Sequence, residues 1–163
     1  MATQALDRVG FITVGPSNQG KTEYCRRVLI PQLIGRFGCE QVLYTSGDFE
    51  RQELFDSVEV HLRPAEVWQA VYHKVHAGTD KKAIIIDGTH LQPVYRAASL
   101  EALGKAGITH ITALVFESQS LEECQGRSRN RSGHCVPASE IERHFQTFVP
   151  IGAGEGFAEI MRF

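Results

Sequence analysis

The residues best suited to chemistry are eight near the start of the chain, Gly15-Pro16-Ser17-Asn18-Gln19-Gly20-Lys21-Thr22. They fit the pattern G-x-x-x-x-G-K-S/T, in which backbone N–H groups surround the phosphates of a nucleotide. Gly15 and Gly20 allow torsion angles and a close backbone approach that a Cβ atom would prevent. The Lys21 ammonium suits the β and γ phosphates, and the Thr22 hydroxyl can complete the shell of a Mg²⁺ ion. The pattern therefore predicts a site for ATP, or another nucleoside triphosphate, together with Mg²⁺.

The segments on either side of this loop supply the setting that it needs. Residues 9–14 (VGFITV) are apolar and β-branched, which predicts a buried strand, and apolar residues recur at helical spacing from Thr22 onward. A strand, a loop and a helix in this order are required for a phosphate-binding loop. The alternative is a glycine-rich turn between strand and helix that binds no ligand.

Two acidic residues follow predicted strands. Asp87 ends the apolar run 83–87, where a carboxylate can hold Mg²⁺ through water, or can instead cap the next helix. Asp48 follows the run 41–46, where a carboxylate can accept the proton of an attacking hydroxyl. Arg51, one helical turn further, points the same way and could bind an anionic group of the acceptor. The alternative is an ordinary capping aspartate beside an exposed arginine.

The densest basic stretch, residues 127–134 (RSRNRSGH), contains Arg127 and Arg131. Arginines stabilise the charge of a phosphoryl group in transfer, and a mobile segment could bring them to it, so we predict a lid over about 126–137. The alternative is a solvated, positively charged loop. Thr89 and His90 lie in the loop after the third strand and could touch an acceptor.

The composition limits the class of protein. The 163 residues, 42% hydrophobic and 22% charged, predict one globular domain over 1–163. A net charge of −2 argues against a protein that coats long nucleic acids, but it allows a local basic pocket for one strand end. No apolar run approaches the length of a membrane span, and residues 1–8 lack a secretory pattern, so we expect a cytoplasmic protein with four reduced cysteines and no membrane partner. The sequence leaves the oligomeric state open.

The periodicity alternates strands with helices, which predicts an α/β fold. We expect a doubly wound, mainly parallel sheet of five strands with helices on both faces. Residues 56–63 fit either a loop or a short extended piece. The expected strands cover residues 9–14, 41–46, 83–87, 108–116 and 157–163, and the expected helices cover 20–37 (with a kink or break at Pro31), 48–55, a segment from Pro64, 93–105, 120–127 and 137–148.

Taken together, these motifs resemble the polynucleotide kinase branch of the P-loop kinases over nearly the whole chain. That branch carries an Asp-x-x-Arg element after the second strand, matched here by Asp48 and Arg51. It also carries a D-x-T-x-L-x-P-x-x-R segment, two arginines four residues apart before Val-Pro, and a final E-G-F-x-E-I. The matching residues here are 87–96, Arg127 and Arg131 with 136–137, and 155–160.

The resemblance implies an ATP-dependent kinase that transfers the γ-phosphoryl group to a 5′-hydroxyl end of DNA or RNA. It implies that Asp48 is the general base, that Arg51 binds the phosphate next to the acceptor hydroxyl, and that Arg127 and Arg131 close over the transferring group. Thr89, His90 and Arg96 would belong to the acceptor side, although His90 stands where many members carry Asn. A kinase of hydroxymethylated bases in DNA, a small-molecule kinase and a nucleotide-binding module without activity remain alternatives.

Overall fold

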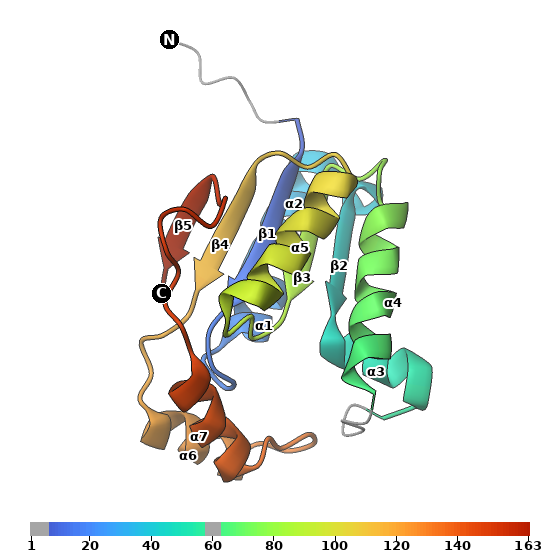
Figure 1. Ribbon diagram of the computed structural model, residues 1–163. Coiled ribbons are helices and arrows are strands. Elements are labelled where there is room, and N and C mark those ends of the chain that lie inside the picture. Colours follow the sequence, from blue (N-terminus) through green and yellow to red (C-terminus); the bar gives the residue numbers. More distant parts are fainter. Residues whose placement is uncertain (1–6, 58–62) are drawn as a thin grey trace.

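The computed structural model describes residues 7–57 and 63–163, and five strands of these residues form one sheet (Figure 1). All neighbouring strands are parallel, and their order is β2-β3-β1-β4-β5. The predicted doubly wound α/β fold is therefore confirmed. The strands are β1 (Val9–Val14), β2 (Val42–Ser46), β3 (Ala83–Asp87), β4 (Ile111–Val115) and β5 (Glu159–Arg162).

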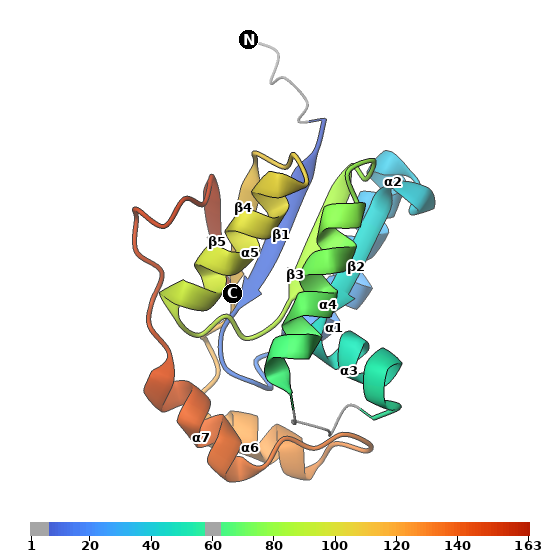
Figure 2. The ribbon, with the colours of Figure 1, turned by 45° about the vertical axis from the view of Figure 1, so that its right-hand side comes forward.

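Helices cover both faces of the sheet. One face carries α4 and α5, the other carries α1 and α2, and α6 and α7 lie beyond the carboxyl ends of the strands (Figures 1 and 2). The α-helices are α1 (Lys21–Tyr24), α2 (Ile30–Phe37), α3 (Gly47–Phe55), α4 (Pro64–Ala77), α5 (Pro93–Lys105), α6 (Leu121–Arg129) and α7 (Ala138–Thr147).

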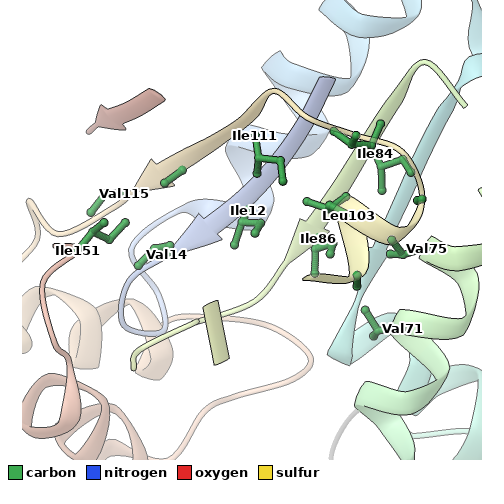
Figure 3. Close-up of a cluster of buried hydrophobic side chains, with 14 residues drawn as sticks. Ile12, Val14, Val71, Val75, Ile84, Ile86, Leu103, Ile111, Val115 and Ile151 are labelled. Carbon is green, nitrogen blue, oxygen red and sulfur yellow. The ribbon is translucent and has the colours of Figure 1, made fainter. Parts of the chain in front are cut away.

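The core lies between the sheet and the pair α4 and α5. Figure 3 shows Ile84 and Ile86 of β3 facing Leu103 of α5 and Val75 of α4, and none of these four side chains is exposed. Each buried aliphatic side chain of this size contributes roughly 1.5–3 kcal/mol relative to an exposed one. A second cluster on the opposite face, which includes Leu29, holds α1 and α2 against the sheet. The strand ends are thereby fixed, and with them the loops that carry polar residues.

The first helical run continues past Pro31 to Phe37, so no break occurs there. It contains a π-helical segment, η1 (Cys25–Leu29), in which the Ile30 N–H bonds the Cys25 carbonyl five residues back. Pro31 has no N–H to donate, and the wider turn before it lets the run pass this position without ending. The predicted kink is thus a local change of helix type.

Some boundaries differ from the expected ones. β4 begins at Ile111 instead of residue 108, because the Ile108 N–H bonds the Leu103 carbonyl in the turn that follows α5. Asp48 is not the N-cap of α3, since the Phe49 N–H bonds the Ser46 hydroxyl at 3.0 Å. The alternatives for 56–63 fall mostly on residues 58–62, outside the described residues. In the described part of the chain, no helix has the length and apolar character of a membrane span.

Candidate active site

The phosphate-binding loop connects β1 to α1 at the carboxyl edge of the sheet. A Cβ atom on Gly15 would lie 2.0 Å from the Phe116 carbonyl oxygen, so only glycine fits there. Gly20 has a backbone φ of +98°, which residues other than glycine rarely adopt. The Gly15 N–H bonds the Thr89 carbonyl at 2.8 Å, which ties this loop to the loop after β3. Both glycines therefore have the structural reason that the sequence predicted.

Lys21 is the buried cation of the loop, with 7% of its surface exposed. Its ammonium group donates a hydrogen bond to the Pro16 carbonyl. Burial lowers the pKa of Lys21 to about 8, and the charges of Asp87 and Asp48 partly oppose this shift.

Asp87 sits at the end of β3, almost fully buried, and accepts three hydroxyl hydrogen bonds. The donors are Thr13, Thr22 and Tyr44, each with an O–O distance of 2.7 Å. A carboxylate next to a threonine hydroxyl offers the hard oxygen ligands that Mg²⁺ prefers. The described residues contain no group of three His, Cys, Asp or Glu side chains that could hold a metal alone. Such a sparse oxygen set fits Mg²⁺ that keeps most of its shell as water and phosphate oxygens.

Asp48 and Arg51 lie in the first turns of α3 and form an ion pair with each other. Asp48 is largely exposed, whereas the Arg51 side chain is mostly covered. Sequence reasoning missed the residue that anchors them, Glu50, which is buried. Its carboxylate pairs with the Lys74 ammonium of α4 at 2.8 Å and accepts the Thr45 hydroxyl at 3.0 Å. Glu50 thus fixes α3 against β2 and α4.

The helices α6 and α7 cover the phosphate-binding loop. Arg127 of α6 donates to the Asn18 carbonyl at 3.1 Å, and the Asn18 amide donates to the Cys124 carbonyl at 3.1 Å. His144 of α7 was not expected in the site, yet its Nδ1 accepts the Ser17 N–H at 3.4 Å. Burial lowers the pKa of His144, so the neutral ring that accepts this bond is favoured. The basic stretch is therefore partly helical and in contact with the loop.

One crevice of about 1510 Å³ joins these groups. Arg131 and Thr89 also line it. Gly15, Pro16 and Gln19 of the loop do not line it. The Gln19 amide instead bonds the backbone of Gln119 through both its ends. The lining residues that carry charge or hydroxyl groups include Ser17, Lys21, Thr22, Tyr44, Asp48, Arg51, Asp87, Thr89, Arg127, Arg131 and Arg143.

Two residues assigned to the acceptor side lie elsewhere. Arg96 is fully buried, with Nε and Nη2 on the Glu155 carboxylate at 2.6 and 2.7 Å and Nη1 on two backbone carbonyls. His90 is also buried, with Nδ1 at 2.8 Å from the Thr13 carbonyl and Nε2 at 2.8 Å from the Ser99 hydroxyl. All their polar atoms are used inside the fold, so the acceptor role is corrected to a structural one.

No protein-family model and no curated protein matches the sequence. Solved structures are similar in fold at low identity. A gluconokinase from Sinorhizobium meliloti 1021 is 15% identical with a TM-score of 0.60, over 96% of this chain and 83% of that one. Kti12 of Chaetomium thermophilum, solved with ADP-AlF3, is 16% identical with a TM-score of 0.72, over 94% and 88%.

A chain of the Pnkp1/Rnl/Hen1 RNA repair complex is 21% identical, with a TM-score of 0.67. The match covers 90% of the present chain but only 45% of that chain, so the present chain spans less than half of it. Together these similarities show that the protein has the fold of P-loop kinases.

Proposed function

We propose that the protein is an ATP-dependent kinase that transfers the γ-phosphoryl group to a hydroxyl of a nucleic acid, at a 5′-hydroxyl end of DNA or RNA. The observation that carries this proposal is one crevice lined by Lys21 and Thr22 of the phosphate-binding loop and by Asp48 and Arg51 of α3. Lys21 and Asp48 both line this crevice, which supports the view that they face the same reaction space.

On the donor side, the amides of the loop and the Lys21 ammonium would hold the β and γ phosphates. Thr22 and Asp87 would hold Mg²⁺, which when bound neutralises charge on the phosphate oxygens. Arg127 already contacts the loop, and Arg131 lines the same crevice, so both can lie over the transferring group. Phosphoryl transfer depends mainly on such positioning and electrostatic stabilisation.

On the acceptor side, the Asp48 carboxylate would accept the proton of the attacking hydroxyl. The hydroxyl oxygen then bonds to the γ phosphorus, the bond from that phosphorus to the bridging oxygen breaks, and ADP leaves. Arg51 would bind the phosphate next to the hydroxyl, as its guanidinium suits a phosphate. The Asp48 and Arg51 spacing matches the polynucleotide kinase pattern, and this match favours a nucleic acid over other acceptors.

A small-molecule kinase is the second candidate. The net charge of −2 favours it, because a protein with a negative net charge does not attract a long nucleic acid by its overall charge. Both candidates share the donor side and differ only in what α3 and its surroundings bind. A kinase of hydroxymethylated bases would likewise keep the donor side.

The test is transfer of labelled γ-phosphate to four acceptors side by side: 5′-hydroxyl DNA, 5′-hydroxyl RNA, DNA with hydroxymethyl bases, and free nucleosides. We expect transfer to a 5′-hydroxyl end. Asp48→Asn should reduce it by about 10²- to 10⁴-fold while ATP binding persists, because a general base is lost. Asp56→Asn, at the other end of α3, is the matched control. Absence of transfer to any polymer would refute the nucleic-acid acceptor, and full activity of Asp48→Asn would refute the base.

A further inference from the structure

Trp68, the single tryptophan of the chain, lies in the first turns of α4. Helix α4 packs beside α3 near the carboxyl edge of the sheet (Figure 2). Trp68 lines the same crevice as Asp48 and Arg51. The indole is only half-buried, so part of it packs on the core and part faces the crevice. A large apolar ring therefore borders the space assigned to the acceptor.

The fold holds this ring in place. A Cβ atom on Gly88 would lie 2.9 Å from the indole, so the indole edge rests on the backbone just after Asp87. His90 packs edge-on against the indole, with ring centroids 5.4 Å apart, and its own two nitrogens are bonded within the fold. The Glu50–Lys74 ion pair joins α3 to α4 and keeps the Asp48 and Arg51 pair at a set position relative to Trp68.

A second, smaller groove lies along α4. It measures about 460 Å³, and Trp68 lines both spaces. Tyr72, one turn further, lies with its ring centroid 5.8 Å from that of Trp68 at an interplanar angle of 35°. The two rings thus form a short aromatic strip, of which Trp68 also lines the crevice and Tyr72 lines the second groove. Its lining residues are Ala65, Trp68, Gln69, Tyr72, His73 and His76.

We infer that Trp68 is the stacking surface for the nucleobase of the 5′-terminal nucleotide of a single-stranded acceptor, with Tyr72 beside the next base. This inference rests on the proposed function. The position of Trp68 on both the crevice and the second groove supports it, and so does the Arg51 cation, which suits the backbone phosphate beside that base. Stacking on an aromatic ring tolerates all bases, since every base has a π-face. The acceptor would then need a base at its end, but no particular base.

The single tryptophan makes the inference testable by fluorescence without any turnover. The full chain is titrated with a 5′-hydroxyl oligothymidylate that carries an anisotropy label at its 3′ end, and with the same oligomer abasic at its two 5′-terminal positions. We expect the intact oligomer to quench the tryptophan emission and the abasic oligomer to bind about 10-fold or more weakly, with little quenching. Anisotropy reports binding independently of the quenching.

Variants separate stacking from a merely structural role. Trp68→Ala should raise the KM for the intact oligomer by about 10- to 100-fold and leave the KM values for the abasic oligomer and for ATP nearly unchanged. Trp68→Phe, which keeps an aromatic ring, should reverse most of this increase in KM. Tyr95→Ala, an exposed aromatic outside the crevice, is the matched control. If Trp68→Ala raised the KM equally for the intact and the abasic oligomer, or if the intact oligomer bound without quenching the tryptophan emission, the stacking role would be overturned while the proposed function stands. A wild-type chain that neither binds nor phosphorylates any oligomer would overturn the proposed function and this inference together.

Discussion

The donor side and the acceptor side of the crevice are built differently. On the donor side, Asp87 is buried and holds three hydroxyl groups, and Lys21 is almost fully covered. On the acceptor side, Asp48 is 61% exposed and has one ion pair with Arg51 inside the same helix. Ion pairs with a partner open to solvent contribute little to stability, about 1 kcal/mol or less. The fold thus already holds the donor-side groups in place, whereas the side chains of Asp48 and Arg51 can change conformation at little cost in free energy.

This difference indicates where specificity can vary. A change at Asp87 or Thr13 disturbs a buried network, because a polar partner left without its hydrogen bond in the interior costs about 1–3 kcal/mol. A change at Asp48 or Arg51 leaves such buried bonds intact, since their ion pair lies within α3 and Asp48 is largely exposed. One donor architecture can therefore serve several acceptors, and substitutions on the two sides should separate in their kinetic effects.

The largest effect is expected for the arginine that lies over the loop. Arg127→Ala should lower kcat by about 10³-fold or more, because charge on the transferring group loses its stabilisation, while the affinity for ATP changes far less. Single-turnover kinetics with bound ATP would measure this. Arg129→Ala, on the same helix but outside the crevice, is the control. Equal rates for the two variants would contradict the role of Arg127.

A smaller effect, confined to the acceptor side, is expected for Arg51. Arg51→Ala should raise the acceptor KM by about 10- to 100-fold, since a charged hydrogen bond to phosphate is lost, and Arg51→Lys should recover part of it. The KM for ATP should stay constant, which steady-state kinetics with each substrate varied can show. Gln52→Ala serves as the neighbouring control. An equal rise in the KM for the acceptor and the KM for ATP would contradict the separation of the crevice into a donor side and an acceptor side.

The donor side should depend on pH through Lys21. Its pKa of about 8 in the folded protein means that the ammonium loses its proton as the pH rises through 8. The affinity for ATP should therefore be constant below pH 8 and fall by up to about tenfold per pH unit above it. Equilibrium titrations between pH 7 and pH 10 would measure this, and Lys21→Met should bind weakly at every pH. A flat profile in the wild-type protein would contradict the assignment.

The smallest expected effect concerns stability and tests the correction at His90. Burial lowers its pKa to about 4, below the ordinary value of 6.5. The unfolded chain therefore binds more protons than the folded protein between these values, and the free energy of unfolding should fall as the pH drops from about 6.5 to 4. The slope for one such group is at most about 1.4 kcal/mol per pH unit. Urea denaturation at several pH values would show it, and His90→Asn should have a shallower slope.

Local patterns predicted the sheet and the phosphate-binding loop, because strand periodicity and glycine requirements act over a few residues. The positions of Asp48, Asp87 and Thr22 at one edge followed from the rule that parallel strands end together. Contacts between distant segments could not be predicted in this way. The Arg96–Glu155 pair is separated by 59 residues and the contact of Ser17 with His144 by 127, and nothing in either neighbourhood marks the partner.

The π-helical segment escaped prediction for a different reason. Composition around Pro31 indicates that the regular hydrogen-bond pattern must change, but it does not say whether the chain bends, stops or widens one turn. Cys25 and Leu29, at the two ends of the segment, pack in the buried cluster on the α1 and α2 face of the sheet, a contact that the local sequence does not specify.

The ion pair between Asp48 and Arg51 has a consequence for substrate discrimination. While the pair is closed, the Arg51 guanidinium occupies a carboxylate oxygen of Asp48. Under the proposed function, an incoming phosphate competes for the guanidinium and releases the base at the moment the hydroxyl arrives. An alcohol without an adjacent phosphate leaves the ion pair closed. The pair would therefore release Asp48 for catalysis only when the acceptor carries a phosphate next to its hydroxyl.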